Sequence, residues 1–230
     1  MIHFIVLTIF PRLFQNFTEE SIIKKAREKK LLKIEVVDVR KFGLGKRKIV
    51  DDRPFGGGIG MVMRIEPFFE ALKRKVKFKI KKTKISPPKE TEIIFLTPRG
   101  KIFNQKMAWQ LSKKKKIVLI CGRYEGIDER VATHLSTKKI SLGNYVTMGG
   151  EAGAMMIIEA ISRLVPGVLG KPQLLKERKE GEGFREYPQY TRPAIFSPKK
   201  GIFWKVPKVL LSGNHQLIEN WRKKHQKIIE

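Results

Sequence analysis

Cysteines, carboxylates and long apolar runs are all scarce in this 230-residue chain. The single cysteine, Cys121, excludes an internal disulfide and a zinc site built from several cysteines. The N-terminal apolar run, residues 4–10, is too short to cross a membrane, and no basic segment precedes it as in a signal peptide. We therefore expect a cytoplasmic protein with no membrane-embedded part.

The shortage of acidic residues leaves a large positive charge. Lysine and arginine number 49 against 22 aspartates and glutamates, so the formal charge is +27. Such a field attracts polyanions, and nucleic acid is the leading candidate partner. Basic faces that meet only solvent are the alternative, and a membrane surface is disfavoured because no amphipathic anchor helix is present. Hydrophobic residues make up 41%, which argues against disorder.

Apolar strands alternate with helices in the middle of the chain. The patterns predict strands over 92–96, 117–121 and 139–142, and helices over 104–112, 128–135 and 151–164. This alternation is typical of a parallel α/β sheet. The three strands are followed by the irregular loops 97–100, 122–126 and 143–150. Because the carboxyl ends of parallel strands meet at one edge, we expect these loops to form a ligand site.

The flanking regions are less regular. We predict strands over 2–9 and 33–40, helices over 18–32 and 65–74, and a basic edge strand over 75–82. Residues 41–63 carry six glycines and form an unusually long loop, which indicates a functional or mobile segment. Residues 169–188 are polar and favour a linker, and a small helical domain follows them.

Basic and aromatic side chains are mixed near the C-terminal end, at Phe203, Trp204, Trp221 and Arg222. Such mixtures suit contacts to phosphates together with stacking on bases. The other interpretation, which we favour for the tryptophans, is an apolar helical core surrounded by solvated lysines.

Common catalytic motifs are missing from the sequence. It contains no GxxxxGK[ST] phosphate loop and no GxSxG elbow, and its four histidines are scattered. Cys121 is interpreted as a small buried hydrophobe. Taken alone, Glu151 and Arg163 would only complement the dipole of the helix predicted over 151–164.

Taken together, six motifs resemble the bacterial tRNA (guanine-N1)-methyltransferase family. They are RPFGGGIGM at 53–61, GRYEGIDER at 122–130, ISLGNYVTMGGE at 140–151, RLVPGVLG at 163–170, YPQYTRP at 187–193 and LLSGNHQLIENWR at 210–222. The motifs span nearly the whole chain in the family's order. The resemblance implies a knotted (SPOUT-type) methyltransferase: an α/β parallel-sheet domain with a deep C-terminal trefoil knot, plus a small helical C-terminal domain.

The resemblance also implies partners and domain limits. It predicts a homodimer that binds S-adenosyl-L-methionine in the knot and methylates N1 of the guanosine at tRNA position 37, with Mg²⁺ as a further candidate cofactor. The expected domains are a knotted S-adenosylmethionine-binding domain at 1–168, a linker with an active-site loop at 169–190, and a helical tRNA-binding domain at 191–230.

Site residues follow from the same motifs. The cofactor-binding residues implied are Leu96, Thr97, Pro98, Gly122, Tyr124, Glu125, Gly126, Ser141, Leu142, Gly143, Asn144, Tyr145, Val146, Thr147, Gly149 and Gly150. Arg163 matches the family's essential arginine. Glu182 stands where the family has the aspartate that acts as general base, and Gly153 stands where the family often has proline.

These roles agree with the chemistry of guanine. N1 carries a proton at neutral pH, so a carboxylate must remove it, and an arginine or metal ion can stabilise the charge that develops on O6. The alternatives are a related knotted methyltransferase with another RNA target, and a basic RNA-binding protein without catalysis.

Overall fold

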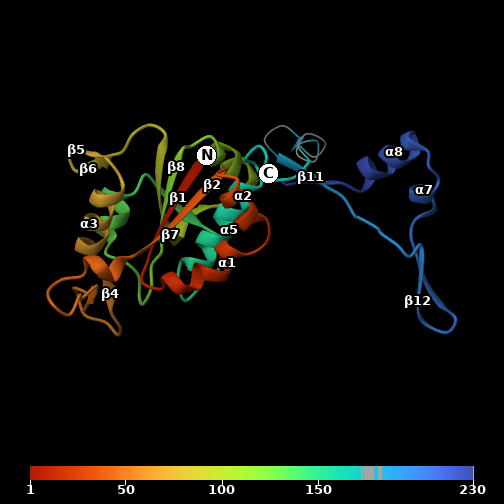
Figure 1. Cartoon of the computed structure of the whole chain (residues 1–230). Helices are drawn as coiled ribbons and strands as arrows, with labels where there is room; N and C mark the ends of the chain where they lie inside the picture. Colours follow the sequence, from red (N-terminus) through yellow and green to blue (C-terminus); the bar gives the residue numbers. More distant parts are fainter. Residues whose placement is uncertain (172, 174–178, 181–182, 230) are drawn as a thin grey trace. The chain divides into compact units, whose positions relative to one another are not determined.

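Five parallel strands form the central sheet of the first part of the chain in the computed structural model (Figure 1), and their order is β2-β1-β8-β7-β9. They are β1 (Ile2–Thr8), β2 (Leu32–Asp38), β7 (Thr91–Ile102), β8 (Lys116–Ile120) and β9 (Lys138–Ser141). The predicted parallel α/β sheet is therefore confirmed, and the two N-terminal strands belong to it. The structure describes residues 1–171, 173, 179–180 and 183–229, in two compact units, Met1–Gln173 and Leu174–Glu230, which are considered separately.

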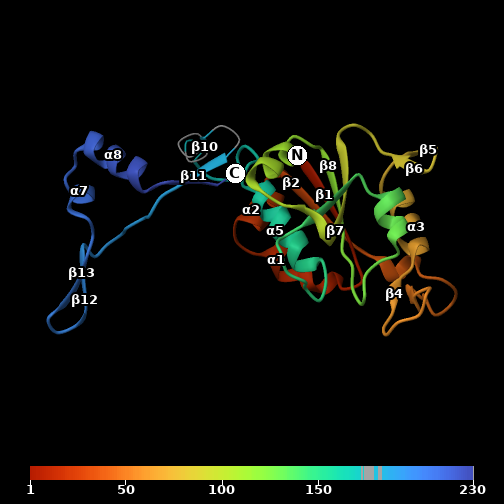
Figure 2. The same ribbon diagram turned by 180° about the vertical axis from the view of Figure 1, so that it is seen from behind.

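Helices cover both faces of the sheet in the first unit. Helix α3 (Ile65–Lys75) lies on one side, and α1 (Gln15–Glu19), α2 (Ser21–Glu28) and α5 (Glu151–Ser162) lie on the other (Figure 1 and Figure 2). Further helices among residues 1–171 are η1 (Pro11–Phe14), η2 (Val39–Phe42), α4 (Gln105–Ser112) and the π-helix η3 (Val131–Leu135). With both faces covered, the strands can be apolar throughout, as β1 and β8 are.

Alternate side chains of β1 point to the two opposite faces of the sheet. Ile5 and Leu7 belong to a buried cluster that includes Phe68 and Leu72 of α3. Phe4 and Val6 are also fully buried, and successive side chains of a strand point to opposite faces. The sheet is thus the centre of two apolar layers.

The single helix predicted over 18–32 is wrong. Glu20 is extended, with φ −120° and ψ 156°, and Ser21 has φ 53°, so the helix is interrupted between α1 and α2. Leu32 does not continue a helix, because it pairs with Ile2 as the first residue of β2 and is buried. Tertiary pairing therefore overrides the helical pattern at the end of this segment.

Strand β7 runs through the segment 97–100 that the sequence predicts as a loop. Leu96 and Lys101 both register with Ile140 of β9, so the four residues between them form a bulge outside the ladder. A Cβ atom on Gly100 would lie 2.5 Å from the backbone N of Ile140. The bulge needs glycine at this position because the two strands approach so closely.

Short hairpins occupy the predicted loop and edge strand. Strands β3 (Asp51–Asp52) and β4 (Val62–Met63) pair across the glycine-rich stretch, and β5 (Lys79–Lys81) pairs with β6 (Lys84–Ser86). The strand predicted over 75–82 is shorter than expected, because Lys75 still belongs to α3 and β5 begins only at Lys79.

The second unit contains strands as well as helices, so the expectation of a helical domain is incomplete. Its elements are β10 (Lys179–Glu180), β11 (Gly183–Glu186), β12 (Ile195–Lys199), β13 (Ile202–Lys205), α7 (Lys208–Leu211), α8 (His215–His225) and β14 (Lys227–Ile229). Strands β10, β11 and β14 form one sheet, and β12 and β13 form a separate hairpin.

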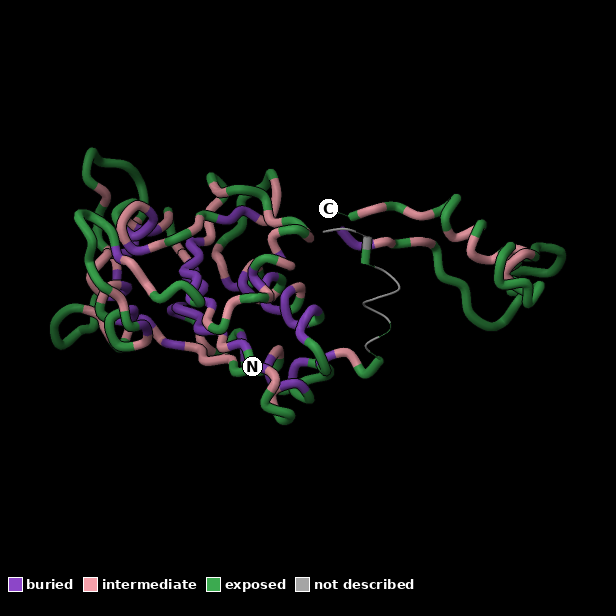
Figure 3. The backbone as a smooth tube through the Cα atoms, turned by 90° about the horizontal axis from the view of Figure 1, so that it is seen from above, coloured by how far each residue is buried: buried purple, intermediate pink, exposed green. Residues whose placement is uncertain are grey.

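Burial differs sharply between the two units (Figure 3). Among the residues of the second unit whose burial is described, only Gly183 and Phe184 are buried. Trp204 is 62% exposed, so our interpretation of this tryptophan as a core residue is wrong. No helix in the described part of the chain has both the length and the apolar character that a membrane crossing requires.

Candidate functional site

A cavity of about 450 Å³ lies beside the bulge of β7 and the ends of β8 and β9. Three loops line it, and they include fourteen of the predicted cofactor-binding residues: Leu96, Thr97, Pro98, Gly122, Tyr124, Glu125, Gly126, Ser141, Leu142, Tyr145, Val146, Thr147, Gly149 and Gly150. The structure thus brings together residues that lie up to 54 positions apart in the sequence. Gly143 and Asn144 are not among the lining residues, and the ring of Tyr145 packs against Gly143 instead.

Nine further residues line the cavity without having been named as cofactor-binding: Phe95, Arg99, Arg123, Ile127, Ile140, Met148, Ala152, Gly153 and Met156. Arg99, Arg123 and Met148 do lie in the loops expected to form the site. Three others follow from helical spacing, because Ala152, Gly153 and Met156 share one face of α5 directly after the third loop. Gly153 lies close to Leu142, because a Cβ added at Gly153 would lie only 3.2 Å from Leu142 Cδ2. The first turns of α5 are therefore part of the wall.

Backbone contacts hold the loops against one another. The Gly150 N–H donates to the Gly122 carbonyl at 3.0 Å, and a Cβ on Gly150 would lie 2.9 Å from the Cα of Cys121. Within the third loop, Ser141 Oγ donates to the Gly143 carbonyl at 2.8 Å and Thr147 Oγ1 to the Gly149 carbonyl at 2.9 Å. These contacts give the cavity a preformed wall.

A buried ion pair supports the same loops. Glu151 is 1% exposed; its Oε1 accepts from Thr8 Oγ1 at 2.6 Å and its Oε2 lies 2.9 Å from Arg123 Nε. Arg123 Nη1 also donates to the Met148 carbonyl at 3.3 Å. The pair joins the end of β1, the second loop, the third loop and the start of α5, so Glu151 does more than favour the helix N-terminus.

Cys121 lies beside this pair and is fully buried, which confirms its interpretation as a small hydrophobe. Burial, and then the nearby Glu151 carboxylate, raise the pKa of the Cys121 thiol well above its usual value. The thiol therefore stays protonated and is not a candidate nucleophile.

The glycine-rich loop, residues 53–61, is anchored on the second loop of the cavity. The Glu125 N–H donates to the Met61 carbonyl at 3.1 Å, and the Met63 N–H donates to the Gly126 carbonyl at 2.9 Å. A Cβ on Gly60 would lie 2.6 Å from Glu125 Cγ, while Phe55 is fully exposed. The segment predicted to be functional therefore borders the cavity.

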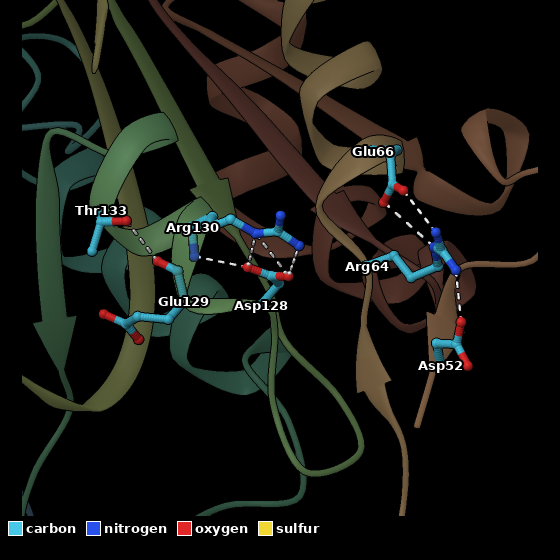
Figure 4. Close-up of polar contacts among 7 residues, drawn as sticks. All are labelled: Asp52, Arg64, Glu66, Asp128, Glu129, Arg130 and Thr133. Atoms are coloured by element: carbon cyan, nitrogen blue, oxygen red, sulfur yellow. Dashed lines mark hydrogen bonds and ion pairs between the residues drawn. The ribbon is translucent and has the colours of Figure 1, made fainter. Parts of the chain in front are cut away.

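Carboxylates near this loop are held by arginines (Figure 4). Arg64 contacts Asp52 and Glu66, each at 2.7 Å, and Arg130 contacts Asp128 at 2.6 Å. The Arg64 guanidinium lowers the pKa of Glu66, and the Arg130 guanidinium lowers the pKa of Asp128. These two acids are ionised at neutral pH and are poorly suited to take up a proton.

Glu129 is engaged in the same way by side chains from other elements. It contacts Lys139 at 3.1 Å and Arg99 at 2.5 Å, and a hydrogen bond from Lys139 is the main cause of its lowered pKa. Within the ranges that the structure describes, no three His, Cys, Asp or Glu side chains are grouped to hold a metal ion.

Of the two predicted catalytic residues, the structure describes Arg163, which lies apart from the cavity wall. Arg163 is exposed at the C-terminal end of α5, two helical turns beyond Met156, and is not among the lining residues. Its N–H donates to the Glu159 carbonyl at 3.1 Å. Glu182 lies outside the described residues.

Comparisons with known proteins give one answer. The model of the family described as tRNA (Guanine-1)-methyltransferase TrmD matches residues 2–229. A tRNA (guanine-N(1)-)-methyltransferase of Dictyoglomus turgidum is 48% identical over 224 residues, which are 97% of this chain and 84% of the relative. Relatives of the same name from Moorella thermoacetica and Thermus thermophilus are 48% and 45% identical, each over 95% of this chain and over 82% and 84% of their own length.

Proposed function

The chain belongs to the tRNA (guanine-1)-methyltransferase family, and from this premise we propose that it transfers the methyl group of S-adenosylmethionine to the guanosine at position 37 of tRNA. It is an enzyme that methylates N1 of guanine in tRNA. The donor molecule and position 37 are our proposals. The observation that carries them is the cavity beside the bulge of β7 and the ends of β8 and β9, in a chain matched from residue 2 to residue 229.

The cavity suits a ligand with a flat base and a short charged chain. Leu96, Ile140 and Met156 offer apolar contact for an adenine, and the glycines of the second and third loops leave backbone amides and carbonyls within reach of polar groups. When bound, S-adenosylmethionine supplies a methyl group activated by a sulfonium. The residues of the chain have to orient it and keep water away.

The acceptor nitrogen must lose a proton as it gains the methyl group. We assign the proton to the Glu182 carboxylate, and we assign to Arg163 the negative charge that develops on guanine O6. Because N1 lies on the pairing edge of the base, the guanine must be unpaired before it reacts. Glu66 and Asp128 are both held by arginines, which supports the assignment of the general base to another carboxylate of the chain.

A homodimer fits the position of Arg163. That side chain lies at the far end of α5 from the cavity, so we propose that a second copy completes the site, as the family resemblance implies.

We also propose that the chain forms a trefoil knot, which is supported by the tight contact of Gly150 with Gly122 and Cys121. The second unit, with its basic surface, is proposed to bind tRNA.

Mg²⁺ stays a prediction from the resemblance. No cluster of three or more ligating side chains occurs among the described residues, so we assign no protein residue to it.

The reaction is tested with labelled S-adenosylmethionine and two tRNA transcripts that differ only in having guanosine or adenosine at position 37. We expect label only in the guanosine transcript. Label in both would retain the methyltransferase and refute the target position. Binding of tRNA without label in either would favour an RNA-binding protein.

The catalytic assignments are tested by substitution. Glu182→Gln should lower turnover by roughly a hundredfold to ten-thousandfold while S-adenosylmethionine still binds, because only the proton acceptor is lost. Unchanged turnover in Glu182→Gln would move the base elsewhere, with Glu180 and Glu177 the next candidates, so Glu180→Gln is measured beside it. Arg163→Ala should also lower the rate of methyl transfer by orders of magnitude. A mild loss would show that Arg163 only complements the helix dipole.

A further inference from the structure

The hairpin formed by β12 and β13 presents large apolar side chains to solvent. They are Ile195, Phe196, Ile202, Phe203 and Trp204, with exposed fractions between 47% and 62%. Every residue of both strands is exposed. Because an isolated two-stranded hairpin is marginally stable in water, and clustered exposed aromatics mark interaction sites, this element is expected to have a partner.

The strand register places an aromatic pair on one face. Phe196 is directly opposite Trp204, and their ring centroids are 5.7 Å apart with the planes tilted by 40°. The register shift between Phe196 and Lys199 brings Lys199 opposite Ile202, two residues from Trp204 and therefore on the same face. A lysine thus accompanies the aromatic pair.

The other face repeats this combination. Ile195 is paired with Lys205, and Phe203 shares their face because it lies two residues from Lys205. Each side of the hairpin therefore carries at least one aromatic ring and one lysine.

Charge identifies the kind of partner. The segment 187–218 contains no aspartate or glutamate, but it contains Arg192, Lys199, Lys200, Lys205 and Lys208. A second copy of a chain with a formal charge of +27 would bring cations against these lysines, whereas a polyanion would neutralise them. Every nucleic-acid base offers a π-face to an exposed ring.

We propose that the β12–β13 hairpin is a stacking platform for unpaired bases of the RNA substrate. Trp204 and Phe196 contact a base, and the adjacent lysines contact the phosphates beside it. This proposal rests on the proposed function in taking tRNA as the RNA. It assigns the hairpin to binding and not to methyl transfer, which takes place in the cavity of the first unit.

The test is Trp204→Ala in the full chain, with tRNA affinity measured directly by a filter or calorimetric assay. We expect the dissociation constant for tRNA to rise between roughly fivefold and a hundredfold, because one base loses its stacking partner. S-adenosylmethionine affinity and turnover at saturating tRNA should not change. Trp204→Phe should keep most of the tRNA affinity, since it keeps a ring at the same position.

Ile80→Ala is the matched control. Ile80 is 63% exposed, against 62% for Trp204, and it also lies on a lysine-rich hairpin, but the residue paired with it across the strands is Ile85 and not an aromatic one. It should leave tRNA affinity unchanged. Phe203→Ala tests the second face, and circular dichroism shows whether each variant is folded.

Three outcomes overturn the proposal. The first is a tRNA affinity of Trp204→Ala within twofold of the parent chain, and the second is an equal loss in Ile80→Ala. The third is weaker self-association of Trp204→Ala in sedimentation, which would assign the hairpin to contact with a second copy. Since tRNA binding is measured without methyl transfer, failure of the proposed reaction gives a different result from failure of the stacking platform.

Discussion

Glu151 and Arg123 illustrate how single residues can determine the shape of the cavity. A buried carboxylate is costly unless it is paired and hydrogen-bonded, and Glu151 has both Arg123 and Thr8 as partners. Removing one member of such a pair leaves the other charged and buried. The ion pair therefore couples folding stability to the arrangement of the three loops.

Arg123→Met should lower the free energy of unfolding by about 3–5 kcal/mol, because it leaves Glu151 buried without its cation. Affinity for S-adenosylmethionine should fall as well, since the second and third loops lose a shared anchor. Urea unfolding and calorimetry measure the two effects.

The control is Lys115→Met, which breaks the pair between Lys115 and Glu90, two side chains that are 73% and 58% exposed. It should change stability by no more than about 1 kcal/mol. Equal small losses in both variants would contradict the role given to Arg123. Adding Glu151→Gln to Arg123→Met should recover part of the loss.

His3, at the start of β1, should make the folding stability of the protein depend on pH. Burial, followed by the charge of Lys33, lowers the pKa of His3 below 6.5, even though Glu35 acts in the opposite direction. As pH falls through 6.5, the unfolded chain therefore takes up a proton at His3 before the folded chain does. The contribution of the neutral His3 side chain to folding stability is therefore fully present above pH 6.5. It is lost as the pH falls towards the pKa of His3 in the folded chain.

We expect the free energy of unfolding to decrease between about pH 7.5 and pH 5.5, and His3→Gln to weaken this dependence. His215→Gln, at an exposed position of α8, should retain it in full. Denaturant unfolding at several pH values is the measurement. Identical profiles for His3→Gln and the parent chain would rule out the assignment to His3.

For single residues, the sequence predicted which of them belong to the site better than it predicted the side-chain contacts that they make. The ends of the predicted strands placed the loops 97–100, 122–126 and 143–150 at one site, and the family resemblance added Leu96 and Ser141, both of which line the cavity. The side of α5 that faces the cavity was not predicted, although Met156 lies one helical turn beyond Ala152. Nothing in the local pattern of the sequence relates Thr8 to Glu151, because they meet only when the sheet forms.

Among the elements, β7 differs most from what its sequence pattern predicts. Apolar residues stop at Leu96, yet the strand continues to Ile102 after a bulge. Pairing with Ile140 on both sides of the bulge is a long-range contact that no local signal reveals. The bulge moves Thr97 and Pro98 out of the ladder and towards the cavity.

Gly100→Ala should destabilise the protein by about 1–3 kcal/mol, because the new Cβ would lie 2.5 Å from backbone atoms of Ile140 that are held in the sheet. Thermal or urea unfolding measures the loss. Gly170→Ala is the control, since a Cβ there meets nothing within 4 Å, and it should be neutral or slightly stabilising. A tolerated Gly100→Ala would mean that β9 can shift away from the bulge.

For the whole molecule, the alternation of strands and helices predicted the fold class, but not the strand order. The position of β1 between β2 and β8 depends on its pairing with β8, more than a hundred residues away. The small sheets of the second unit were missed because β10, β11 and β14 are only two to four residues long. Such strands are too short for a period of two to be recognised.

The charge of +27 leads to a prediction for the complete enzyme. Affinity for tRNA should fall by roughly a thousandfold or more between about 50 mM and about 200 mM salt, because lysines and arginines that contact phosphates release counterions on binding. Binding of S-adenosylmethionine should change little over the same range. Filter binding and calorimetry provide the two curves, and a tRNA affinity that is independent of salt would show that few phosphates are contacted.

The strand order also bears on how the chain is made by the ribosome. Strands β1 and β2 are synthesised first and can pair at once, but the other neighbour of β1 begins only at Lys116. At roughly 5–20 residues per second, the free edge of β1 stays open for on the order of ten seconds. An open, apolar strand edge is a template for pairing with other chains. The nascent protein therefore needs shielding at this edge until β8 has left the ribosomal tunnel.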